Sequence, residues 1–205
     1  MLLHLLNVIT AYRPNKLSKK IKKETKQKHD AIEKHPLLVE LVNGTLPDYK
    51  YGIYLINLLP IYTSVETFFL NNTSNTDLIQ SEKIRKDLHS YSKYLNVNFN
   101  NANVLFYSDW ISHFFSKDQF FKKTELYVRW LADMYGGQIL KKKVRFGEKY
   151  EFKDLRDSIK TIRKEIEDGL NEQNVDQFID EVNKTYDFHY KLADKVYGCP
   201  ESLIR

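Results

Sequence analysis

The sequence has one cysteine, few glycines and prolines, and no long apolar run. Cys199 is the only cysteine among 205 residues, which excludes an internal disulfide framework and suits a reducing compartment. The best apolar run, Tyr54 to Tyr62, is broken by Asn57 and Pro60 and falls short of the roughly 20 residues that span a bilayer. The opening residues lack the basic start and cleavage site of a signal peptide. We therefore expect a soluble, cytoplasmic protein.

Several catalytic motifs are also missing. None of the six histidines has a glutamate three residues earlier, so the helical di-iron pattern is absent. The sequence contains no His-Glu-x-x-His zinc motif, no glycine-rich phosphate loop and no Gly-x-Ser-x-Gly elbow. Metalloprotease, nucleotidase and serine-hydrolase functions thus have no local support. A net charge of +5 favours anionic ligands or an acidic partner, and no spacing typical of nucleic-acid binding accompanies it.

The apolar residues that are present recur mostly at spacings of three and four. With 42% hydrophobic and 29% charged residues, the composition is that of a globular protein, and the spacing predicts a nearly all-helical fold. We expect an N-terminal arm over 1–16 and one helical domain over 17–205. Ser18 is the predicted N-cap of the first long helix. The expected helices are Lys19–Lys34, Leu37–Asn43, Tyr49–Leu70, Leu78–Leu95, Val104–Phe115, Phe120–Val144, Phe152–Leu170 and Val175–Tyr197.

The stretch from Leu126 to Val144 contains an unusual pair, Gly136-Gly137, inside a predicted helix. Each glycine costs a helix interior roughly 0.5–1 kcal/mol relative to alanine, and such a pair can mark a kink. The helical rotation places Asp133 on the same side as both glycines. A flat ligand could lie against this bare main chain. The alternative is close helix packing, with Asp133 paired to Arg129 one turn earlier.

Two other groups are candidates for ligand binding. His29 lies at the edge of the apolar stripe of its helix with Glu33 one turn later, which suits an axial iron ligand. The alternative is a surface histidine among charged side chains. Lys160, Arg163 and Lys164 share one face and could hold carboxylates, or they could simply form a solvated face.

Taken together, these stretches resemble heme oxygenase. The run from Arg129 to Lys142 is similar to the distal-helix signature of that family, and the run from Lys22 to Glu33 is similar to its proximal helix. The resemblance extends more weakly from about Leu17 to Val196. It implies an all-α single-domain bundle in which heme is sandwiched between a proximal helix and a kinked distal helix.

The resemblance also implies roles for particular residues. His29 matches the proximal iron ligand and Glu33 the acid near it. Asp133 matches the distal aspartate that organises a water network, and Gly136 and Gly137 match the glycines over the heme. Tyr62, Arg129 and Tyr127 match polar residues of the distal side and heme edge. Lys22, Lys160 and Lys164 match basic residues that face the propionates. Tyr186 matches an aromatic residue of the pocket wall.

The implied activity is oxidative cleavage of heme b, at once substrate and cofactor, by O2 to biliverdin, CO and ferrous iron. No flavin or nicotinamide motif is present, so electrons would come from an external reductase, ferredoxin or flavodoxin with an acidic surface. Ala132, Trp130 and Tyr135 depart from the family pattern. These departures leave open a heme carrier or sensor without turnover. A helical enzyme acting on a thiamine-like compound is a third alternative, although Cys199 is poorly placed as a nucleophile.

Overall fold

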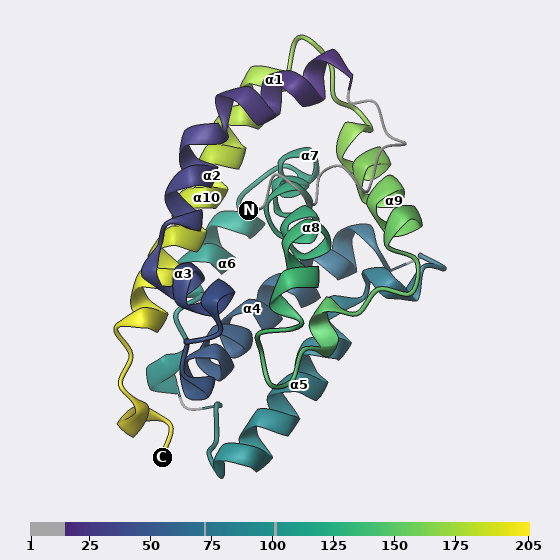
Figure 1. Cartoon of the computed structure of the whole chain (residues 1–205). Coiled ribbons are helices and arrows are strands. Elements are labelled where there is room, and N and C mark those ends of the chain that lie inside the picture. Colours follow the sequence, from purple (N-terminus) through teal and green to yellow (C-terminus); the bar gives the residue numbers. More distant parts are fainter. Residues whose placement is uncertain (1–14, 72, 101) are drawn as a thin grey trace.

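The computed structural model describes residues 15–71, 73–100 and 102–205, which form a helical bundle without strands (Figure 1). The predicted all-α class is confirmed. Residues 1–14 of the predicted arm lie outside the described residues. The last two residues of that arm, Asn15 and Lys16, already belong to the first helix and its cap.

The first predicted helix is in fact two, α1 (Lys16–Glu24) and α2 (Lys26–Glu33), separated at Thr25. The Thr25 hydroxyl donates to the carbonyl of Ile21 at 2.9 Å, a side-chain bond that competes with regular helical pairing. The predicted N-cap was wrong: Asn15 caps α1, and its side-chain oxygen accepts from the Ser18 amide at 2.8 Å.

The centre of the bundle is α4 (Asp48–Phe69), which packs along α5 (Gln80–Leu95). Pro60 lies inside α4 without ending it. The last helix, α10 (Val175–Tyr197), runs beside α2 and α3 (Pro36–Asn43) and closes one side of the molecule (Figure 1). The remaining helices are α6 (Ser108–Phe115), α7 (Gln119–Lys122), α8 (Leu131–Leu140) and α9 (Leu155–Glu167). None of the described helices is both long and apolar enough to cross a lipid bilayer.

The glycine-containing segment differs from its prediction. The expected helix Phe120–Val144 consists of α7, a π-turn over Leu126–Trp130, and α8. In the π-turn the amide of Leu131 donates to the carbonyl of Leu126, five residues back. By contrast, α8 continues through Gly136 and Gly137. The interruption that we expected at the glycines therefore lies upstream of them.

Candidate functional site

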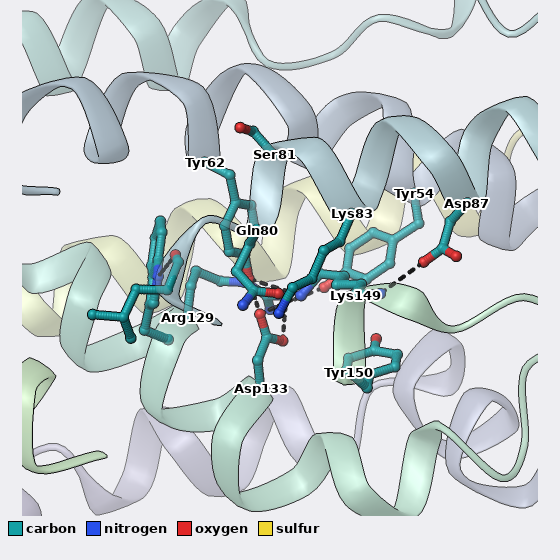
Figure 2. Close-up of polar contacts among 12 residues, drawn as sticks. Tyr54, Tyr62, Gln80, Ser81, Lys83, Asp87, Arg129, Asp133, Lys149 and Tyr150 are labelled. Atoms are coloured by element: carbon teal, nitrogen blue, oxygen red, sulfur yellow. Dashed lines mark hydrogen bonds and ion pairs between the residues drawn. The ribbon is translucent and has the colours of Figure 1, made fainter. Parts of the chain in front are cut away.

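Asp133 stands at the centre of a buried polar cluster (Figure 2). Its side chain leaves α8 toward α4 and is 3% exposed. The hydroxyl of Tyr62, on α4, and the ammonium of Lys149 both donate to the same carboxylate oxygen of Asp133. The other oxygen lies 3.5 Å from a guanidinium nitrogen of Arg129. The structure thus brings together three side chains that the sequence predicted, Tyr62, Arg129 and Asp133, and adds one that it did not, Lys149.

Lys149 enters this cluster on a short 3-10 turn, η5 (Glu148–Tyr150), which follows α8. The carboxylate of Asp87, on α5, accepts from the Glu148 amide at 2.9 Å and the Lys149 amide at 3.0 Å. The Tyr91 hydroxyl accepts from the Arg145 amide at 3.0 Å, one turn further along α5. These bonds fix the backbone of the segment against α5, so the Lys149 side chain extends into the interior and is 0% exposed.

Burial shapes the electrostatics of the cluster. Loss of solvation lowers the pKa of Lys149 from 10.5 to about 8. The negative charge of Asp133 opposes this lowering, and the positive charge of Arg129 adds to it. Burial likewise raises the pKa of the Tyr62 hydroxyl well above its ordinary value, so this group stays a proton donor. Arg129 also donates to the Tyr54 hydroxyl at 3.1 Å. The carboxylate of Asp133 is therefore held between the ammonium of Lys149, the guanidinium of Arg129 and the hydroxyl of Tyr62.

The two glycines have different surroundings. A Cβ placed on Gly136 would meet nothing within 4 Å, whereas one on Gly137 would lie 2.6 Å from Cδ1 of Tyr150. Ala132, one turn before Gly136, is exposed. The bare main chain at Gly136 therefore faces open space, while Gly137 permits close packing of η5. The close packing expected at this face is found at Gly137, and ligand binding at Gly136 stays a prediction.

His29 lies on α2 with its side chain 46% exposed. Its Nε2 is 3.6 Å from a carboxylate oxygen of Glu33, and its Nδ1 is 3.8 Å from one of Asp30. The ring meets the edge of Tyr186, from α10, with centroids 5.9 Å apart. Neither carboxylate is within hydrogen-bonding distance of the imidazole, so the geometry leaves a nitrogen available to a metal. By contrast, His35 is buried, and its Nε2 lies 2.9 Å from Asp194.

Tyr186 lies beside this histidine, and Tyr127 lies near Tyr186 and Thr25. Burial raises the pKa of Tyr127, and a hydrogen bond with Thr25 opposes that rise, which places the π-turn against the junction of α1 and α2. Burial also raises the pKa of Tyr186, and the nearby Tyr127 and Glu33 add to the effect. The π-turn thus links the surroundings of His29 to those of Asp133. Its Tyr127 lies near Tyr186, which contacts His29, and its Arg129 lies beside Asp133.

The predicted basic residues divide into two kinds. Arg163, on α9, donates to the Tyr135 hydroxyl of α8 at 2.8 Å and joins the two helices. Lys22, Lys160 and Lys164 are exposed. Among the described residues, no hydrogen bond or ion pair involves these three lysine side chains, so their charges are available to an anionic ligand.

A cavity of about 300 Å³ lies between α4, α6 and α10, and His29 and Asp133 are not among its lining residues. Its wall includes Trp110, Phe188 and His189. The Nε2 of His189 lies 2.9 Å from Glu125 in the protein interior. This cavity is separate from the residues that the sequence singled out.

A family model described as heme oxygenase matches residues 15–195. The chain is also similar to the heme oxygenase of Porphyra purpurea, with 22% identity over 212 residues that cover 92% of this chain and 89% of that protein.

Solved structures show the same architecture. Heme oxygenase-1 from Synechocystis sp. PCC6803 in complex with heme matches with a TM-score of 0.73 and 20% identity, covering 90% of this chain and 93% of that one. Heme oxygenase-2 from the same organism, in complex with heme and NO, matches with a TM-score of 0.71 and 19% identity. The match covers 89% of this chain and 85% of that one. The heme oxygenase of Leptospira interrogans matches with a TM-score of 0.70 and 18% identity. The match covers 87% of this chain and 98% of that one. At these identities the likeness concerns the fold.

Proposed function

The chain belongs to the heme oxygenase family, and from this premise we propose that it binds heme between α2 and α8 and cleaves it with O2 to biliverdin, CO and ferrous iron. In this proposal His29 is the iron ligand, and the main chain at Gly136 lies against the opposite face of the ring. Two observations carry it: an exposed imidazole on α2, and a glycine on α8 with open space beside it.

The residues present fit such a ligand. A side chain at position 136 would occupy the open space that the structure leaves there, and glycine keeps it free. The exposed Lys22, Lys160 and Lys164 provide positive charge for the two propionates. Tyr186 supplies aromatic surface next to His29, and Tyr127 extends that surface beyond Tyr186.

Heme, bound as substrate, supplies the iron that activates O2, and the protein supplies position and protons. Asp133, with Arg129 and Tyr62 at its carboxylate, is the proposed group that directs proton delivery toward the ligand side of α8. No flavin or nicotinamide motif occurs in the sequence, so we assign the electrons to an external ferredoxin, flavodoxin or reductase. The net charge of +5 favours an acidic donor surface.

The test is aerobic turnover. The purified chain is loaded with hemin and supplied with a reductant under air, and the pigment is identified by chromatography and mass spectrometry. The expected result is loss of the heme absorption band together with formation of biliverdin. Hemin uptake by the wild type without pigment formation would contradict the proposed catalysis. Absence of hemin uptake would contradict the proposed binding site.

A heme carrier or sensor is the second candidate, favoured by one observation. The carboxylate of Asp133 is already paired with Lys149 and Arg129 in the interior, which could lock the acid in place. A carrier would retain a persistent heme band in the same assay, whereas an oxygenase consumes it.

A further inference from the structure

We propose that Lys149 is a positioning residue for Asp133, whose ammonium holds the carboxylate in its orientation toward Tyr62, so that turnover depends on Lys149 being protonated. The inference rests on the proposed function for its effect on heme cleavage. Its structural part concerns this chain alone.

The first argument is placement. A lysine with 0% exposure is rare, because burial of an ammonium without a partner is costly. The Nζ of Lys149 donates to the Tyr62 hydroxyl oxygen at 3.0 Å and to the carboxylate of Asp133. Tyr62 in turn donates to the same carboxylate oxygen. The three groups close a ring of hydrogen bonds, which fixes that oxygen more tightly than either bond alone would.

The second argument is the construction that delivers the lysine. Two amides of η5 are bound to Asp87, and Tyr150 fits against the bare backbone of Gly137. The packing therefore depends on a glycine in α8 one turn after Asp133. Acid and lysine are positioned by the same contact between α8 and η5.

The third argument is charge. The charged and titratable groups that face Lys149 come from every element packed around it: Asp133 of α8, Arg129 of the π-turn, Tyr54 and Tyr62 of α4, Lys83 and Asp87 of α5, and Tyr150 of its own turn. Arg129 cannot release its proton at ordinary pH. Of the two cations paired with the Asp133 carboxylate, Lys149, whose pKa is lowered to about 8 by burial, is therefore the one that titrates.

Lys83 provides a matched control. It reaches the same region from α5 (Figure 2), but its ammonium donates to the carbonyls of Asp77 at 3.1 Å and Glu151 at 2.6 Å. Lys83→Met thus removes a nearby positive charge without removing a bond to Asp133.

The test begins on the chain without heme. Lysine side-chain resonances, labelled with ¹³C and ¹⁵N, are followed by NMR as a function of pH. One resonance is expected to titrate near pH 8, to be absent from Lys149→Met, and to titrate at lower pH in Asp133→Asn, because the partner anion is lost. A Lys149 resonance that titrates in the ordinary range of lysine, or that is unmoved in Asp133→Asn, would overturn the proposal whether or not heme is cleaved.

The second measurement is the pH profile of turnover by the heme-loaded chain. The rate is expected to fall as pH rises through 8, as Lys149 loses its proton. Lys149→Met should be slower by about tenfold at pH 7 and lack this limb, whereas Lys83→Met should keep the falling limb, moved to higher pH because a neighbouring positive charge is lost. In an Asp133→Asn background, Lys149→Met should have less than about a twofold further effect. An unchanged profile in Lys149→Met, or equal losses in both backgrounds, would contradict a role through Asp133.

Discussion

The ring of Tyr150 occupies the space that a side chain on Gly137 would need, with Cδ1 2.6 Å from the position of such a Cβ. Gly136, the preceding residue, has nothing within 4 Å of the same position. Two adjacent glycines therefore serve two purposes. One admits the turn that carries Lys149, and the other leaves α8 bare toward the proposed ligand.

Alanine substitutions should separate these purposes. Gly137→Ala should lower the free energy of unfolding by about 1–3 kcal/mol, because the Tyr150 ring must move. Gly136→Ala should stabilise the chain without heme by about 0.5–1 kcal/mol through helix propensity. Chemical denaturation measures both values. Gly136→Ala should nevertheless weaken hemin binding in a spectroscopic titration, and hemin affinity equal to wild type would place the ligand elsewhere.

His29→Ala should abolish or alter the iron-ligand signature of the hemin complex, since no other imidazole is exposed on α2. Optical and electron paramagnetic resonance spectra of the ferric complex measure this change. His35→Asn is the control, because asparagine can still cap α3. That variant should lose some stability, as the bond to Asp194 weakens, but keep the wild-type spectrum. An unaltered spectrum in His29→Ala would exclude His29 as the ligand.

Reversing the charges of Lys160 and Lys164 should weaken hemin binding or change which position of the ring is cleaved. Both side chains are exposed on α9 and would face anionic propionates. Hemin titration and identification of the bilin isomer are the measurements. Arg85→Glu with Lys93→Glu, on exposed positions of α5, changes the net charge equally. If both double variants behave alike, the lysines of α9 act only through the overall charge.

Lys149 should also leave a signature in the pH dependence of stability. Its pKa is about 8 in the folded chain against an ordinary 10.5, so between these values the unfolded chain binds the proton that the folded chain has released. The unfolding free energy should therefore rise with pH above 8, by up to about 1.4 kcal/mol per pH unit. Denaturation of the wild type and Lys149→Met from pH 7 to 10 gives this contribution as a difference. A difference that stays constant across the range would be inconsistent with a buried ammonium.

Local patterns in the sequence predicted much of the fold. The spacing of apolar residues indicated the helical class, and the expected helix Leu37–Asn43 is found as α3, with Pro36 as its first residue and Gly44 as its C-cap. The pairing of Asp133 with Arg129 one turn earlier was also foreseeable, because it lies within one helical stretch. Relations of this kind involve residues close in the chain.

The π-turn and Lys149 depend on tertiary contacts instead. Lys149 lies in a strongly charged stretch, where a lysine is ordinarily solvated. The bonds of Asp87 to its turn and the packing of Tyr150 on Gly137 direct it inward. Likewise, the low helix propensity of glycine suggested a break at Gly136-Gly137. The helix α8 nevertheless stays regular there, with Tyr150 packed against Gly137. No local sequence signal distinguishes these outcomes.

The wide turn at Leu126–Trp130 has a consequence for how such a site can diverge. A π-turn holds one more residue than an α-turn, and each residue rotates a helix by about 100°. Loss of that residue would swing the acid of α8 out of reach of Tyr62 and would turn the bare backbone at Gly136 by the same angle. Insertions and deletions upstream of α8, more than substitutions within it, would therefore change the direction in which Asp133 and the bare backbone at Gly136 point.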